Sequence, residues 1–296
     1  MITHCKRRIH QSPPFGRDMH ISHQTPEGKE AYPTQIPQFG LGVFLMSDGG
    51  ECKSSVLAAF DAGYTHIDTA SMYQNERDVG QALKETGVER SSVFITTKLR
   101  RGDAVGYEET IEQCKKSLEL LDTEYIDLYL VHAPPLDPAH RAPVWKAMEH
   151  CLEQGWVKSI GVSNYGAAHL DAMKKYANYM PSVNQVEYNP WLQRPHLKKA
   201  TEESGARLMA YSPLARGLKV DDPKLAEIAK RLNCTPAQVA IKFCYDQGCI
   251  TIPKSSNPKR IIENIESLNV DISGEMEAII ALDENYISGW DPTTEL

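Results

Sequence analysis

The sequence predicts a (β/α)₈ barrel, and three observations lead to this fold class. Short apolar segments alternate with longer segments of helical periodicity, and the alternation runs through eight strand and helix pairs. The 296 residues are enough for eight such pairs around one large core. Polar and ionisable residues follow most of the strands, at the end where barrels of this kind build their functional sites.

The eight expected strands are short and rich in apolar or β-branched residues. They cover residues 38–44, 65–69, 93–98, 126–131, 157–162, 183–187, 207–211 and 250–252. A doubly wound open sheet is the alternative, because the same alternation permits it. No strand is followed by a G-x-G-x-x-G turn, which counts against a dinucleotide-binding open sheet.

The expected helices show apolar residues at a spacing of three to four. After the first three strands they cover 52–64, a stretch from Asn75 and Glu76 to a stop at Gly87, and 107–121. The next three are marked by Trp145, Met148 and Leu152, by Leu170, Met173 and Ala177, and by Leu197 and Ala200. Two helices follow the seventh strand, and the second opens with a capping box at residues 235–238. Asn257 caps another helix after the eighth strand, and a last helix begins near Ser273.

Residues 1–30 are polar and rich in His and Pro, and we expect them to form a loose extension ahead of a single barrel domain at 31–296. The basic, nearly acid-free character of the extension also fits an organellar presequence, but the amphipathic pattern of one is missing. No apolar run approaches the roughly 20 residues of a membrane span, so no membrane partner is expected. The net charge of -7 disfavours a nucleic-acid partner. Seven cysteines without a C-x-x-C pair favour reduced thiols and a cytoplasmic location.

Chemically useful side chains gather at the predicted strand ends. Asp68, Lys98 and His132 each close a strand, and Tyr73 lies five residues after Asp68. A phenol has a free pKa of about 10, and a nearby lysine can lower it by roughly one to three units while a carboxylate holds the lysine. His132 could donate a hydrogen bond to a substrate oxygen. Taken singly, each residue also has a structural interpretation as a cap, a solvated strand end or a packed ring, but their joint occurrence favours a proton-handling site.

The site needs a partner that supplies electrons. The cysteines lack the spacing of metal ligands, and His132 has no histidine partner within one helical turn, so no metal is expected and an organic cofactor is implied.

Seven motifs together make the chain resemble an aldo-keto reductase. They are HIDTASMYQNE (66–76), FITTKL (94–99), DLYLVH (127–132), GVSN (161–164), NQVEYNP (184–190), AYSPL (210–214) and IPKSSNPKRIIEN (252–264). The resemblance is greatest to short-tailed members such as 2,5-diketogluconate reductases and microbial prostaglandin F synthases. It implies a monomeric barrel that reduces aldehydes or ketones with NADPH, and a catalytic tetrad of Asp68, Tyr73, Lys98 and His132.

The resemblance also implies the cofactor contacts. Ser163, Asn164 and Gln185 would bind the nicotinamide carboxamide, and Tyr211 would stack on its ring. Ser212, Leu214 and the following loop would line the pyrophosphate. The 2'-phosphate and the adenine would be held by the set Lys254, Ser255, Arg260, Glu263 and Asn264.

The substrate pocket departs from the family pattern. Ala133 and Arg100 stand where many relatives carry an aromatic residue and a tryptophan, while Phe44 keeps the aromatic position after the first strand. We therefore expect Phe44, Arg100 and His132 to border a wider and more polar pocket for an anionic or bulky carbonyl, unless Arg100 points into solvent. Two other functions stay open, namely a Schiff-base aldolase with Lys98 as nucleophile and a non-catalytic NADPH-binding subunit.

Overall fold

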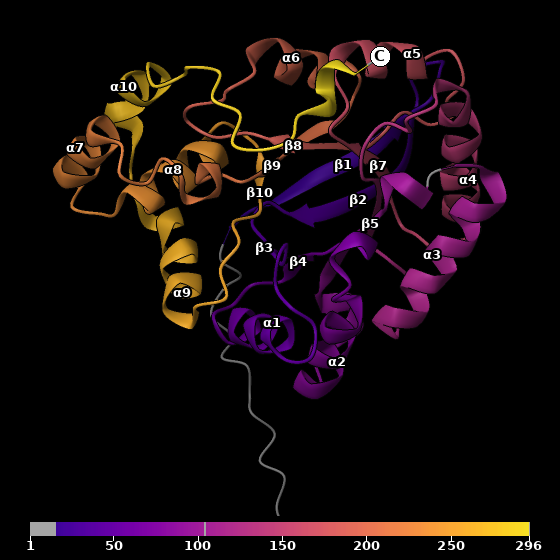
Figure 1. The fold of residues 1–296 in the computed structure, drawn as a ribbon, viewed down its shortest axis with the longest axis horizontal. Coiled ribbons are helices and arrows are strands. Elements are labelled where there is room, and N and C mark those ends of the chain that lie inside the picture. Colours follow the sequence, from indigo (N-terminus) through magenta and orange to yellow (C-terminus); the bar gives the residue numbers. More distant parts are fainter. Residues whose placement is uncertain (1–15, 104, 296) are drawn as a thin grey trace, which may run out of the picture.

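The fold is a closed barrel of parallel strands, seen in a computed structural model that describes residues 16–103 and 105–295 (Figure 1). Eight parallel strands follow one another in the order of the chain. They are β3 (Leu41–Gly42), β4 (His66–Asp68), β5 (Phe94–Leu99), β6 (Leu128–Val131), β7 (Ile160–Ser163), β8 (Val183–Glu187), β9 (Arg207–Tyr211) and β10 (Ile250–Thr251). Parallel bridges from Phe39 to Thr251 and from Gly42 to Lys254 join the first strand to the last. The predicted (β/α)₈ barrel is therefore confirmed, and the open sheet is excluded.

Ten α-helices of the described residues surround the strands (Figure 1). They are α1 (Glu51–Asp61), α2 (Glu76–Thr86), α3 (Tyr107–Leu121), α4 (Arg141–Glu153), α5 (Ala167–Met173), α6 (Pro195–Glu203), α7 (Pro223–Leu232), α8 (Pro236–Asp246), α9 (Pro258–Glu266) and α10 (Met276–Ile280). The capping box of Thr235 and Gln238 is present, and the Asn257 side chain caps α9. Helix α5 ends at Met173, so Ala177 lies beyond the helix to which its spacing assigned it. Within the described residues, no helix combines the length and the apolar character that crossing a membrane requires.

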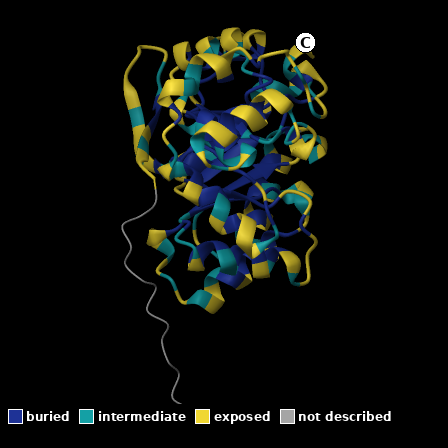
Figure 2. Ribbon diagram, turned by 90° about the vertical axis from the view of Figure 1, so that its left-hand side faces the viewer, coloured by how far each residue is buried: buried dark blue, intermediate teal, exposed yellow. Residues whose placement is uncertain are grey.

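An antiparallel hairpin closes the N-terminal end of the barrel. Its strands are β1 (Asp18–Gln24) and β2 (Glu30–Pro37), and Figure 2 shows the hairpin along one side of the molecule. Ile21 and Ile36 join the apolar cluster inside the barrel, and the His23 ring bonds the Met180 carbonyl at 2.8 Å. The expectation of a loose extension over 1–30 therefore fails for residues 18–24, while residues 1–15 lie outside the described part of the chain.

The barrel interior is apolar below the site. Buried side chains from five strands meet the hairpin there, among them Phe94, Leu128, Val183, Met209 and Ile250. Figure 2 shows the buried strands inside a shell of half-buried and exposed helices. Because the hairpin and this cluster fill the N-terminal end, access to the barrel is left to its C-terminal end.

The chain returns over the C-terminal end of the barrel after α10. Ser288 donates to the buried Glu187 through its backbone N–H at 3.2 Å and through its hydroxyl. Asp291 pairs with Arg194 at 3.0 Å, and Glu295 pairs with Arg101. We call residues 288–295 the C-terminal strap, because these contacts hold it at three points across the mouth of the barrel.

Gly80 tests the packing of α2 on α3. A Cβ atom at Gly80 would lie 2.5 Å from the Leu121 carbonyl oxygen, which is backbone and cannot swing away. We expect Gly80→Ala to lower the free energy of unfolding by about 1–3 kcal/mol in urea titrations. Gly274→Ala is the control, since nothing lies within 4 Å of its added Cβ. Equal stability of the two variants would contradict the close packing described for Gly80.

Candidate active site

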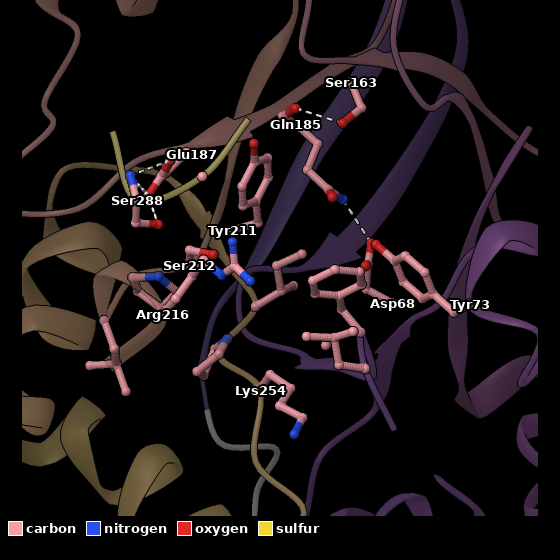
Figure 3. A pocket seen from close by; sticks show the side chains of 18 of the residues that line it. Asp68, Tyr73, Ser163, Gln185, Glu187, Tyr211, Ser212, Arg216, Lys254 and Ser288 are labelled. Atoms are coloured by element: carbon pink, nitrogen blue, oxygen red, sulfur yellow. Dashed lines mark hydrogen bonds between the residues drawn. The ribbon is translucent and has the colours of Figure 1, made fainter. Parts of the chain in front are cut away.

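A cavity of about 610 Å³ opens at the C-terminal end of the barrel. Side chains from β4, β7, β8 and β9 line it. Residues from the loops that follow β3, β4, β6, β7, β9 and β10 line it as well. Figure 3 shows Asp68, Tyr73, Ser163, Gln185 and Tyr211 converging on it. The cavity therefore collects most of the polar strand ends that the sequence singled out.

Lys98 is completely buried at the floor of the site. Its Nζ atom lies 2.5 Å from Asp68 Oδ1, 2.8 Å from the Thr69 carbonyl oxygen and 3.4 Å from the Tyr73 hydroxyl. The second Asp68 oxygen accepts a hydrogen bond from Gln185 Nε2 at 2.7 Å. The ammonium and the carboxylate thus satisfy each other inside the protein, and the phenol of Tyr73 is aimed at the same lysine.

Burial decides the proton affinities in this group. It raises the pKa of Asp68 and lowers the pKa of Lys98, since both charged forms lose water. The pKa of Tyr73 is raised well above its usual value, first by burial and then by the negative charge of Asp68. The expectation that Lys98 lowers this pKa does not hold here, because Asp68 offsets the lysine charge. Tyr73 therefore carries its proton throughout the physiological pH range, as a proton donor must.

His132 directly follows β6 and faces Tyr73, whose turn follows β4. The two rings are edge to face with centroids 5.6 Å apart. Burial and the nearby Lys98 charge lower the pKa of His132 to about 3. The ring is therefore neutral at physiological pH and can donate one hydrogen bond to an oxygen placed beside Tyr73.

A polar wall stands beside this group. Tyr211 donates to Asn164 Oδ1 at 2.8 Å, and Asn164 donates to the His132 carbonyl at 2.9 Å and to Ser163 Oγ at 3.1 Å. Ser163 in turn donates to the Gln185 carbonyl at 2.8 Å. The amide hydrogens of Asn164 are thus committed, while the side-chain oxygens of Asn164 and Gln185 can still accept. This wall suits a planar group that carries an amide donor.

Cations gather at the other end of the cavity. Arg216, Lys254 and Arg260 line it, and Figure 3 shows Arg216 on the far side of Tyr211 from Asp68 and Tyr73. Ser212, Leu214 and Gly217 also line the cavity. Ser212, Ala215 and Arg216 have positive φ angles of 49°, 45° and 57°, so the loop after β9 makes a tight, constrained turn. Cations and a hydroxyl in this arrangement suit phosphate groups.

Some predicted site residues lie elsewhere. Arg100 borders a neighbouring depression, where it makes two hydrogen bonds to Asp103 at 2.8 and 3.0 Å. Glu263 accepts from Thr235 at 2.7 Å and so ties α9 to the start of α8. Ser255 bonds Asn257 within the cap of α9, and neither Ser255 nor the buried Asn264 is among the residues that line the cavity. These four side chains therefore do not line this cavity.

Other lining residues were not predicted. Glu187 ends β8 in the quoted NQVEYNP motif, where its position at a strand end was the available signal. Arg216 lies in the loop after Leu214, which the resemblance assigned to the pyrophosphate without naming this residue. Ser288, Gly289 and Trp290 come from the C-terminal strap, which has no periodicity to mark it. These residues reach the cavity only through tertiary contacts.

Comparisons with known proteins agree on one family. The model of the aldo/keto reductase family matches residues 50–283. The glyoxal reductase of Bacillus subtilis is 41% identical over 259 residues, covering 87% of this chain and 93% of the relative. The 9,11-endoperoxide prostaglandin H2 reductase of Trypanosoma cruzi is 42% identical over 262 residues, covering 87% and 92%. A solved Bombyx mori aldo-keto reductase in complex with NADP matches with a TM-score of 0.80 at 30% identity, covering 94% of this chain and 96% of that one.

The buried ring of His132 gives a pH prediction. With a pKa of about 3 in the folded protein and about 6.5 when unfolded, neutral His132 contributes stability that is complete above about pH 6.5 and is lost as the pH falls toward 3. We expect its NMR signals to show no titration between pH 8 and 5. The same sample unfolded in urea should titrate near pH 6.5. A folded-state titration midpoint near 6.5 would contradict the neutral, buried ring.

Proposed function

Because the chain belongs to the aldo/keto reductase family, we propose that it reduces aldehydes and ketones to alcohols with NADPH and that Tyr73 is the proton donor. Carbonyl reduction follows from the family and from relatives that are reductases. The observation that supports the role of Tyr73 is its protonated phenol between the buried Lys98 and the neutral His132.

The residues of the cavity fit a nicotinamide dinucleotide phosphate. The wall of Asn164 and Gln185 presents acceptors for a carboxamide, and Tyr211 beside it offers an aromatic face. Arg216, Lys254 and Arg260 supply positive charge for phosphates at the other end. The bound nicotinamide would supply the hydride, for which the described residues contain no source of their own.

The protein would handle the substrate oxygen. His132 would donate a hydrogen bond to the carbonyl oxygen and hold it beside the Tyr73 hydroxyl. Tyr73 would then give its proton to that oxygen as negative charge develops there. Lys98, held by Asp68 and Thr69, would stabilise the phenolate that remains. A general acid of this kind is typically worth about 10²- to 10⁴-fold in rate.

A Schiff-base aldolase is less well supported by this geometry. The Lys98 side chain is fully buried, and its ammonium is already held by Asp68 and Thr69. A nucleophilic lysine has to be neutral and reach the substrate carbonyl. The positions of Asp68 and Thr69 therefore favour Lys98 as a fixed cation beside Tyr73 over Lys98 as a nucleophile.

The rim of the cavity favours neutral substrates with an apolar group. Phe44, Leu45, Met72 and Trp290 line the mouth and are between 39% and 67% exposed. Arg100 lies outside this cavity, so it does not supply the positive charge that the sequence led us to expect beside Phe44. Burial of an apolar substituent against these side chains would contribute binding at about 25 cal/mol per Å².

Tyr73→Phe tests the proton donor. We expect kcat for an aldehyde panel, followed as loss of NADPH absorbance, to fall by roughly 10²- to 10⁴-fold, while the NADPH dissociation constant changes by less than about twofold. Tyr64→Phe is the control, because its hydroxyl bonds the Ile261 carbonyl away from the cavity. Near-normal reduction by Tyr73→Phe would refute the assignment.

Removal of the cations tests the choice of NADPH. We expect Lys254→Ala combined with Arg260→Ala to raise the Michaelis constant for NADPH by about tenfold or more, equivalent to at least about 1.4 kcal/mol, and to leave that for NADH within about twofold. An unchanged preference for NADPH over NADH would show that these two residues do not recognise the additional phosphate.

A further inference from the structure

Asn75 is a fully buried amide that the catalytic scheme above does not use. It stands between the short helical turn that carries Tyr73 and α2, where the sequence analysis placed the start of a helix. Helix α2 does begin there, at Glu76, but the Asn75 side chain makes no capping hydrogen bond to it. Its polar atoms point back toward the segments around Tyr73 instead.

The Asn75 oxygen is tied to the end of β4. Thr69 donates its hydroxyl to Asn75 Oδ1 at 2.7 Å. The carbonyl of the same Thr69 accepts the hydrogen bond from Lys98 Nζ at 2.8 Å, and Asp68 immediately precedes it. One contact therefore links Asn75 to the residue that helps to hold the catalytic lysine.

The Asn75 nitrogen is tied to the loop after β3. It donates to the Val43 carbonyl at 3.0 Å and to the Met46 carbonyl at 3.1 Å. Phe44 lies between these two anchors, and its ring packs against Tyr73 with centroids 5.0 Å apart. The backbone N–H of Val43 also donates to the Asp68 carbonyl at 3.0 Å. Both amide hydrogens are thus used to fix the loop that supports the phenol ring.

We propose that Asn75 is a positioning residue that sets the Tyr73 hydroxyl against Lys98 by joining three segments, namely the end of β4, the loop after β3 and the turn of Tyr73 itself. The proposal rests on the proposed function, since it assigns Asn75 an effect on proton donation by Tyr73. Three residues separate Tyr73 from Thr69 on one side, and only Gln74 separates it from Asn75 on the other. Gln74 adopts a constrained φ of 60°. Loss of the amide would release these segments from one another, and a displacement of about 1 Å at a reacting group can cost roughly 10²-fold in rate.

The test compares Asn75→Ala with Gln38→Ala in the full-length protein. Gln38 is also a buried amide, and its nitrogen donates to two backbone carbonyls, those of Tyr245 and Cys249, before the first strand of the barrel. We expect Asn75→Ala to lower kcat by roughly 10- to 100-fold with the NADPH dissociation constant within about twofold of wild type. Gln38→Ala should leave kcat within about twofold at an equal fraction of folded protein.

Thr69→Val supplies the partner variant. It removes the hydroxyl that binds Asn75 but keeps the backbone carbonyl that binds Lys98. If Asn75 acts through this contact, the double variant should be about as slow as Asn75→Ala alone, because both changes remove the same link. Independent, multiplicative effects of the two changes would overturn the link through Thr69.

Hydrogen exchange separates this proposal from the proposed function. The peptide covering residues 69–76 should exchange faster in Asn75→Ala than in Gln38→Ala, whether or not any substrate is turned over. If wild-type protein reduces no carbonyl, the proposed function fails. The exchange result alone then tests whether Asn75 holds the turn that carries Tyr73. Unchanged exchange at 69–76, or a kcat for Asn75→Ala equal to that of Gln38→Ala, would overturn the role of Asn75.

Discussion

The buried ion pair of Lys98 and Asp68 is the constraint on which the rest of the site depends. Moving either charge out of water costs several kcal/mol, and an unpaired partner would be worse. The lysine is satisfied by Asp68 and the Thr69 carbonyl, and the carboxylate by Lys98 and Gln185. These groups come from β4, from β5 and from β8 on the opposite part of the sheet. Only a closed barrel brings three such strands to one point, so closure of the sheet and formation of the site are the same requirement.

The pair also explains the protonation states around it. Since Asp68 offsets the charge of Lys98, the lysine does not strip the proton from Tyr73, and burial then keeps the pKa of the phenol high. The same burial keeps His132 neutral and able to donate. Tyr73 thus has a proton to donate, and His132 has a hydrogen bond to donate that orients the accepting oxygen. Its apolar rim and the strap anchored by Glu187 and Arg194 shape what can approach these groups.

Much of this could be predicted from the sequence because the barrel repeats one local pattern. Three elements begin and end at the predicted residues, namely α3, β8 and β9. The polar strand ends identified most of the cavity wall, since parallel strands all present their carboxyl ends on one side. Periodicity could not give the hairpin, whose strands pair with each other, nor the strap, which is held by single contacts. It also could not show that the Arg100 side chain pairs with Asp103. Nor could it show that the Asn75 side chain donates to the Val43 carbonyl and makes no capping hydrogen bond to α2. The raised pKa of Tyr73 could not be predicted from the sequence, because burial raises it and the sequence does not quantify burial.

The most direct test of the account compares Asp68→Asn, Lys98→Met and the double variant in both unfolding and turnover. Each single change leaves a buried charge without its partner, so we expect each to lower the free energy of unfolding by about 3–5 kcal/mol. The double variant should regain much of this stability, because no unpaired charge remains, but NADPH-dependent carbonyl reduction should stay at least about 100-fold below wild type in all three. A double variant that is stable and reduces carbonyls at nearly the wild-type rate would contradict the claim that this ion pair serves the chemistry of Tyr73.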